Sequence, residues 1–147
     1  MSDALEIKIG RSAKRIKVND AGEYITLDFD DQGFLPRFFG LVETVQKTVA
    51  AAAEKEAELN AMPEISEQNL YAKAMAKAQL NLEICKEIGA QIDAVFGDEV
   101  CRKVFGDIVP SVDRYVEFFA QLKTLIAKFA QERREKMERH TAPYTNR

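Results

Sequence analysis

Residues 16–39 read IKVNDAGEYITLDFDDQGFLPRFF and contain the change of pattern that decides the fold. Apolar residues alternate with polar ones in two short runs, Ile16 and Val18, then Ile25, Leu27 and Phe29. A period of two is typical of β-strands. Between the runs, residues 19–22 (Asn-Asp-Ala-Gly) tolerate positive φ and therefore predict a tight hairpin turn.

A third alternation precedes this stretch, at Leu5, Ile7 and Ile9. It predicts a first strand, which a turn at residues 10–13 would join to the next one. A sheet of three short strands with one apolar face is not stable alone in water. We therefore expect this face, formed by Ile7, Ile16, Val18, Ile25 and Leu27, to pack on the first and last helices.

After residue 30 the apolar spacing changes to three and four, which predicts helices. Asp30 and Asp31 can cap the first helix, which should end before Met62-Pro63 because proline is excluded from helix interiors. Ser66 can cap a second helix that Gly97 closes. Its expected core stripe is Leu70, Ala74, Ala78, Leu82, Cys85, Ile88, Ile92 and Val95.

Two further helices complete the expected helical region. A short one covers residues 98–105, and a long one begins near Val112 and becomes almost wholly charged over residues 131–139. The expected core stripe of the long helix is Val112, Tyr115, Val116, Phe119, Leu122, Ile126, Phe129 and Ala130.

These elements predict an α+β fold in a single domain over residues 1–147. A small N-terminal antiparallel β-sheet of about three strands (1–30) is followed by a mainly α-helical region of three long helices and one short helix (31–139). A flexible tail is expected over 140–147. The length of 147 residues is within the size of one domain that buries its own core.

Composition narrows the class of partner. The net charge of -3 is too small to favour nucleic acid, and the longest apolar run, residues 49–53, is far below the ~20 residues that span a bilayer. The first residues, Met1 to Glu6, carry acids where a secretory signal needs basic residues. We therefore expect a cytoplasmic protein that binds neither nucleic acid nor membrane.

The sequence offers no catalytic, metal-binding or cofactor-binding pattern. His140 is the only histidine and lies in the charged C-terminal segment, so we expect it to be solvated. Cys85 and Cys101 are not spaced like zinc ligands and lie among apolar residues, which predicts reduced core thiols; a reactive or cross-linking pair is the alternative. The glycines are scattered rather than clustered into a phosphate loop. We therefore expect no enzyme activity and no cofactor.

Aromatic residues are more abundant on two helices than one core stripe requires. This excess predicts a partner-binding surface on the first and last helices, with an arginine at its polar rim. A core helix that is covered on two sides is the alternative interpretation. The candidate partner-binding residues are Phe34, Arg37, Phe38, Phe39, Tyr115, Phe118 and Phe119.

The order of motifs in residues 16–38 resembles the tail assembly chaperones of long-tailed phages and prophages of Gram-positive bacteria. The resemblance rests on residues 16–20 (Ile-Lys-Val-Asn-Asp), 22–25 (Gly-Glu-Tyr-Ile) and 30–31 (Asp-Asp), then Phe34, Arg37 and Phe38. It covers about the first 45 residues, and the helix order and the segment from Phe96-Gly97 to Phe105-Gly106 extend it more weakly.

The resemblance implies a non-enzymatic protein that coats the aggregation-prone tape-measure protein and helps to recruit the major tail protein. It further implies weak homo-oligomers along the client, in the cytoplasm of a bacterial host. A helical protein with surplus apolar faces fits such a role, since it can shield the exposed helices of a partner. A self-associating helical scaffold of a phage or prophage particle is the structural alternative, and an enzyme with an unorthodox site is a third.

Overall fold

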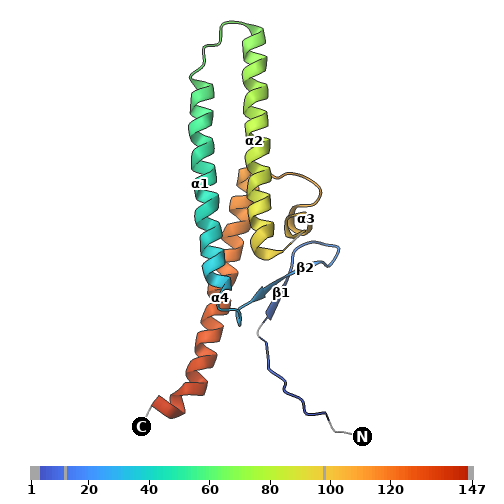
Figure 1. The fold of residues 1–147 in the computed structure, drawn as a ribbon, viewed down its shortest axis with the longest axis vertical. Helices are drawn as coiled ribbons and strands as arrows, with labels where there is room; N and C mark the ends of the chain where they lie inside the picture. Colours follow the sequence, from blue (N-terminus) through green and yellow to red (C-terminus); the bar gives the residue numbers. More distant parts are fainter. Residues whose placement is uncertain (1–3, 12, 98, 146–147) are drawn as a thin grey trace.

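A computed structural model describes the backbone of residues 4–11, 13–97 and 99–145, and the side chains of these residues up to 139. The chain forms a β-hairpin, a long helical hairpin, a short helix and a final long helix (Figure 1). The α+β class is therefore confirmed. The elements are β1 (Ala13–Lys17), β2 (Tyr24–Asp28), α1 (Phe34–Asn60), α2 (Glu67–Phe96), α3 (Val100–Phe105) and α4 (Val112–Thr145).

The β-hairpin has the turn that the sequence predicts. β1 and β2 pair antiparallel with Ile16 opposite Ile25. Gly22 has φ +83° and donates its N–H to the Asn19 carbonyl at 3.2 Å. The Asn19 side chain accepts a hydrogen bond from the Glu23 N–H (3.1 Å) and donates one to the carbonyl of Lys103 (3.0 Å). One asparagine therefore closes the turn and attaches the hairpin to α3.

The expected strand at Leu5, Ile7 and Ile9 is wrong. Residues 4–11 run away from the sheet without pairing to either described strand (Figure 1), and these three side chains are 100%, 89% and 83% exposed. Gly10 and Arg11 form no turn, and Ser12 lies outside the described residues. Alternation predicts an extended segment with one apolar face, but it does not show whether that face finds a partner within the same chain.

The limits of α1 and α2 agree with the sequence signals. α1 ends at Asn60, before Met62-Pro63. At the start of α2 the Ser66 hydroxyl accepts a hydrogen bond from the Asn69 N–H at 3.2 Å, and the helix closes at Gly97, where φ is +114°. These capping residues satisfy backbone groups that helix ends leave free.

The core lies where the sheet and four helices meet. The least exposed side chains in it are Leu27, Phe38, Ile88 and Ile92. Of the expected apolar face of the sheet, Ile25 and Leu27 are buried, Ile16 and Val18 are partly buried against the core, and Ile7 is exposed. Rings pack edge to face at short range, as between Phe34 and Phe96 with centroids 6.0 Å apart.

The core stripes predicted for α2 and α4 are partly wrong. Leu70, Ala74, Ala78 and Leu82 are exposed, and burial on α2 begins at Ile84. The reason is that α4 starts partway along α2, so that beyond this level the hairpin has no third helix to cover it (Figure 1). On α4 the exposed residue is Val116, and Phe118 is buried in its place.

The C-terminal helix is longer than expected. α4 continues to Thr145 and therefore includes the backbone of residues 140–145, which the sequence assigned to a tail beyond the helix; residues 146–147 lie outside the described part. The charged end is rich in Glu, Arg and Lys, which are good helix formers. Gln131 and Glu135, four residues apart, also share a hydrogen bond of 3.4 Å.

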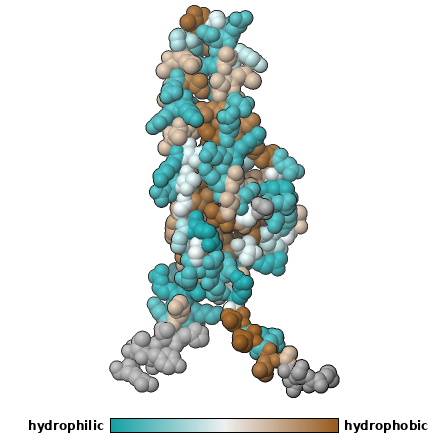
Figure 2. Space-filling model, viewed as in Figure 1, coloured by the Kyte–Doolittle hydropathy of each residue, from teal (hydrophilic) through white to brown (hydrophobic). Residues whose placement is uncertain are grey.

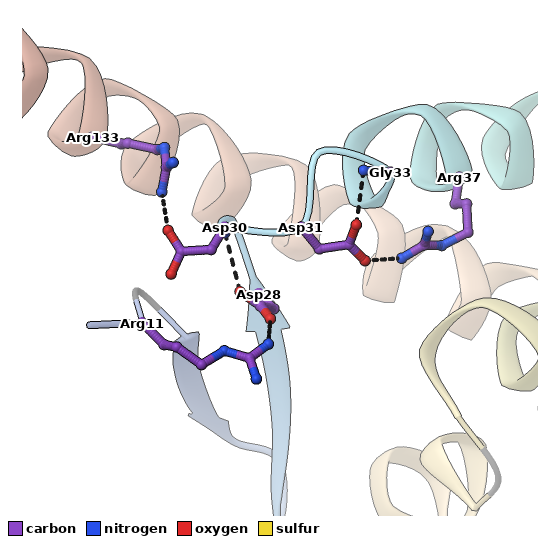
Figure 3. A network of polar contacts seen from close by, with 7 residues as sticks. All are labelled: Arg11, Asp28, Asp30, Asp31, Gly33, Arg37 and Arg133. Atoms are coloured by element: carbon purple, nitrogen blue, oxygen red, sulfur yellow. Dashed lines mark hydrogen bonds and ion pairs between the residues drawn. The ribbon is translucent and has the colours of Figure 1, made fainter. Parts of the chain in front are cut away.

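Three acidic residues at the end of β2 connect the sheet to α1 and α4 (Figure 3). Asp28 pairs with Arg11, and Asp30 pairs with Arg133 of α4 at 2.7 Å. Asp31 accepts hydrogen bonds from the Arg37 guanidinium (2.6 Å) and from the N–H at residue 33 (2.9 Å), and these bonds lower the pKa of its carboxyl below the ordinary value. Asp30 therefore links the sheet to α4, Asp31 links it to α1, and Asp28 holds the segment that precedes β1.

The buried face of β2 yields a first prediction. Replacing Ile25 by Asp places a charge among apolar side chains and should lower the free energy of unfolding by several kcal/mol, enough to unfold a marginal domain. Thr26→Asp on the exposed face of the same strand is the matched control and should keep the wild-type melting curve. Equal melting temperatures for Ile25→Asp and wild type would contradict the assigned core.

The contact between α2 and α4 yields a second prediction. A Cβ at Gly89 would lie 2.9 Å from the hydroxyl of Tyr115, which donates to the Cys85 carbonyl at 2.9 Å. Gly89→Ala should therefore disturb a buried hydrogen bond, at a cost of about 1–3 kcal/mol. In contrast, Gly40→Ala meets no atom within 4 Å and should stabilise α1 by up to about 1 kcal/mol. Calorimetric melting of both variants tests the pair, and a higher melting temperature for Gly89→Ala would show that Tyr115 adjusts freely.

Candidate protein-binding surface

Most of the residues that the sequence suggested for partner binding lie in the core. Phe38 and Phe119, for example, contact each other across α1 and α4 with ring centroids 6.5 Å apart. A partner cannot reach such rings in the folded protein, so the alternative interpretation, a core covered on two sides, describes them correctly. The buried members of the predicted set are Phe34, Phe38, Tyr115, Phe118 and Phe119.

The other two predicted residues lie on the surface. Phe39 is 60% exposed and its ring packs edge-on against Phe38 at 5.7 Å between centroids. Arg37 is half exposed, but its guanidinium pairs with Asp31 at the start of α1. Phe39 is therefore available to a partner, whereas Arg37 contributes to the junction between the sheet and α1.

A longer apolar surface lies on α2, and the sequence interpretation missed it. Apolar or small residues recur at alternating spacings of four and three along the whole helix, which is the repeat of coiled-coil seams. We call this set the α2 stripe. Its members are Tyr71, Met75, Ala78, Leu82, Cys85, Gly89, Ile92 and Phe96.

The C-terminal half of the α2 stripe is covered by α4. The Tyr115 hydroxyl bonds to the Cys85 carbonyl and lies against Gly89, and Phe118 packs on Phe96 with centroids 6.4 Å apart. This half of the α2 stripe is therefore a seam between two helices of the same chain.

The N-terminal half of the α2 stripe is exposed. Tyr71 is 70% exposed, Met75 53% and Leu82 37%. Figure 2 shows hydrophobic side chains between the two long helices and at the end of the hairpin, where Met62 and Ile65 are exposed as well. A seam that is filled by a helix in one half and empty in the other has the geometry to accept a second helix.

The exposed half belongs to an ordered part of the hairpin. Lys73 is largely buried, and its ammonium group donates to the carbonyls of Asn60 (3.2 Å) and Met62 (3.3 Å) and pairs with Glu64 at 3.2 Å. One side chain of α2 thus holds the end of α1 and the connection that follows it. The signal that could have identified the α2 stripe was the presence of Tyr71 and Met75, each one position after a residue of the expected stripe. Together with Leu70 and Ala74 they make the apolar face wider than one core face needs.

Three potentially reactive side chains lie where α2, α3 and α4 meet, and two of them, Cys101 and Tyr115, line a groove of about 380 Å³. Burial raises the pKa of Cys85 and, to about 12, that of Cys101, where the Asp93 carboxylate adds to the effect. Burial also raises the pKa of Tyr115. All three groups are therefore neutral near pH 7 and poor nucleophiles. In the part of the chain that the structure describes, no group of three or more His, Cys, Asp or Glu side chains could hold a metal ion; the side chain of His140 lies outside that part.

The thiols yield a third prediction. Both cysteines are free. Cys85 is buried, as the sequence predicted, whereas Cys101 is only half-buried. At about pH 8 the raised pKa values leave almost no thiolate, so a thiol reagent should label the native protein slowly and the denatured protein at once. A Lys47→Cys variant supplies an exposed thiol as the positive control. Rapid labelling of the native wild-type protein would contradict the burial of the two thiols.

Comparisons with known proteins place the chain in a family. Residues 21–147 match the model of a family described as a family of unknown function, DUF6673, a range that begins in the β-turn and includes β2 and all four helices. No curated protein and no solved structure matches the chain. Among the described residues, no helix combines the length and the apolar character needed to cross a membrane. The chain is a member of the DUF6673 family.

Proposed function

We propose that this protein is a non-catalytic assembly chaperone that covers an apolar helical segment of a client protein with the exposed half of the α2 stripe. The observation that carries the proposal is the continuity of that surface: α4 occupies Cys85, Gly89 and Phe96, while Tyr71 and Met75 are open on the same face of the same helix. A client helix would lie where α4 is absent.

The chemistry of the surface favours an apolar helix over other ligands. An aromatic ring and a thioether stand one helical turn apart at Tyr71 and Met75, and an aliphatic side chain follows two turns later at Leu82, with the small Ala78 between them. Methionine adapts to different partner side chains, and a tyrosine supplies a large contact area at a low cost in side-chain entropy. Such a surface fits a client that presents many similar but non-identical helical segments.

The resemblance to phage tail assembly chaperones supplies the identity of the client. We propose that it is the tape-measure protein, that the major tail protein is a further partner, and that binding occurs in the cytoplasm of the bacterial host. The residues that carry the resemblance, 16–38, form the β-hairpin and the beginning of α1. They lie outside the α2 stripe. The resemblance therefore supports the proposed class of protein, and the exposure of the α2 stripe supports the proposed binding surface.

A self-associating scaffold of a phage or prophage particle is the second candidate. The observation in its favour is the projecting segment of residues 4–11 with its three exposed aliphatic side chains. A scaffold stays in the mature particle, whereas an assembly chaperone leaves before completion. Mass spectrometry of purified particles separates the two candidates, because the peptides of this chain should be absent if it is a chaperone.

The fourth prediction is a solubility test with the candidate tape-measure protein, which would be the product of a neighbouring gene for a very long helical protein. Co-expression with wild type should keep this client soluble. Tyr71→Ala combined with Met75→Ala should abolish the effect, since each truncated anchor costs ~2 kcal/mol, roughly 30-fold in affinity. A pair of exposed polar positions on the same helix, Gln79→Ala with Asn81→Ala, is the matched control.

Two outcomes would contradict the proposal in different ways. If the client is equally insoluble with and without the wild-type protein, the chaperone function is wrong. If the folded α2-stripe variant works as well as wild type, the assigned surface is wrong, and Phe39→Ala then tests the exposed ring on α1. Phe118→Ala is unsuitable here because Phe118 belongs to the core, where truncation costs about 3–5 kcal/mol in stability.

A further inference from the structure

We infer that residues 4–9 of one copy add as a β-strand to the free edge of β1 in a second copy, with their apolar side chains seated in a groove between the β-hairpin and α4. We call residues 4–11 the arm. The partner is therefore another molecule of the same chain, and the contact is separate from the α2 stripe. The inference does not depend on the proposed function.

The arm has the pattern of a strand that lacks a sheet. Leu5, Ile7 and Ile9 alternate with Glu6 and Lys8, so an extended backbone places all three aliphatic side chains on one face. In the isolated chain this face is exposed (Figure 2). Burial of aliphatic side chains is the main driving force of most protein association, and this face offers three of them.

The groove offers a complementary apolar surface. It has a volume of about 380 Å³ and opens beside the C-terminal end of β1. Its floor consists mainly of core side chains, and Arg114, Glu117 and Gln121 form part of its rim. The main apolar lining residues are Ile16, Val18, Val104, Phe105, Phe118 and Leu122.

The edge of β1 can bind the backbone of the arm. Among the described residues the sheet contains only β1 and β2, so one edge of β1 has no strand beside it. Addition of a strand there satisfies the edge by main-chain hydrogen bonds, as in other cases of β-augmentation. Ile16 is partly buried against the core, and Ile25 opposite it is buried. If the aliphatic face of the added arm lies on the same side of the sheet as Ile16, the aliphatic side chains of the arm point toward the groove.

The polar residues of the arm fit the outer face of the sheet. Arg15 alternates with Ile16 and lies over the ring of Tyr24 on that face, while Lys17 also lines the end of the groove. In an added strand, Glu6 and Lys8 alternate with the aliphatic residues and point to the same outer face. They carry opposite charges and pair with each other at 3.6 Å, so the apolar contact, and not a net charge on the arm, supplies the attraction.

The geometry of the arm's base favours exchange between copies over closure within one chain. The groove lies near the end of β1, whereas the arm joins its beginning and leads away from the body (Figure 1). Arg11 reaches across to Asp28 at the end of β2 and fixes the base of the arm in this direction (Figure 3). Folding back would require a reversal between Arg11 and Ala13, while insertion into a second copy leaves the ion pair in place.

Mixing two variants that each carry one engineered cysteine, in addition to Cys85 and Cys101, tests the exchange directly. A chain with Ile7→Cys is mixed with a chain with Gln121→Cys, at the rim of the groove, under mild oxidation. The expected product is a disulfide-linked pair of unlike chains, because neither chain alone carries both engineered thiols. Ile7→Cys mixed with Lys47→Cys, an exposed position on α1, is the matched control and should give little of this product.

The double variant Ile7→Cys with Gln121→Cys distinguishes closure from exchange. An intramolecular disulfide in this variant, without cross-linking between the mixed single variants, would overturn the inference and place the arm on its own sheet. Absence of both products would overturn it as well, since the arm would then not occupy the groove at all.

Association provides an independent measurement. Sedimentation velocity of the wild type should show a reversible, concentration-dependent oligomer, and Ile7→Asp should weaken it by about tenfold or more. Lys8→Asp places the same acid on the polar face of the arm; it is the matched control and should not weaken the oligomer. A wild type that stays monomeric at all concentrations overturns the inference. The α2-stripe variants should associate like wild type, so failure of the client test and failure of arm exchange are distinguishable.

Discussion

The packing of one ring, Phe29, holds the sheet and two helices together. It follows β2 directly, and its centroid lies 5.6 Å from that of Phe34 on α1 and 5.9 Å from that of Phe129 on α4, edge to face in both cases. A two-stranded hairpin is at best marginally stable alone. This contact holds the end of β2 against α1 and α4, and it places the two acids that follow Phe29, Asp30 and Asp31, close to their partners on these helices.

The unequal reach of the helices explains where apolar surface is left over. α1 and α2 form an antiparallel hairpin of 27 and 30 residues, but α4 begins only partway along it and continues past its base (Figure 1). A three-helix region therefore becomes a two-helix region within one uninterrupted α2 stripe. The position of α4 decides which half of the α2 stripe is core and which half is surface, since the apolar spacing is the same in both halves.

The local structure of this chain is largely predictable from its sequence, because turns and caps depend on neighbouring residues. The turn closed by Asn19 and Gly22, the cap at Ser66 and the helix end at Gly97 follow from steric and hydrogen-bonding preferences of single residues. What sequence reasoning could not supply is the relative position of elements. The same alternation produced a paired strand at residues 13–17 and an unpaired arm at residues 4–11. Likewise, the same helical spacing produced a buried Cys85 and an exposed Leu82.

The end of the helical hairpin that α4 does not cover should also open locally more easily than the rest of the molecule. Local opening requires less free energy where few buried contacts must break, so amide hydrogen exchange should be fastest toward the connection between α1 and α2 and slowest around Ile88 and Ile92. The bonds from Lys73 to the connecting segment oppose this fraying. A partner helix on the exposed half of the stripe would suppress the same opening. Binding of that partner to α2 should then slow amide exchange in α1 as well, even without a direct contact between the partner and α1.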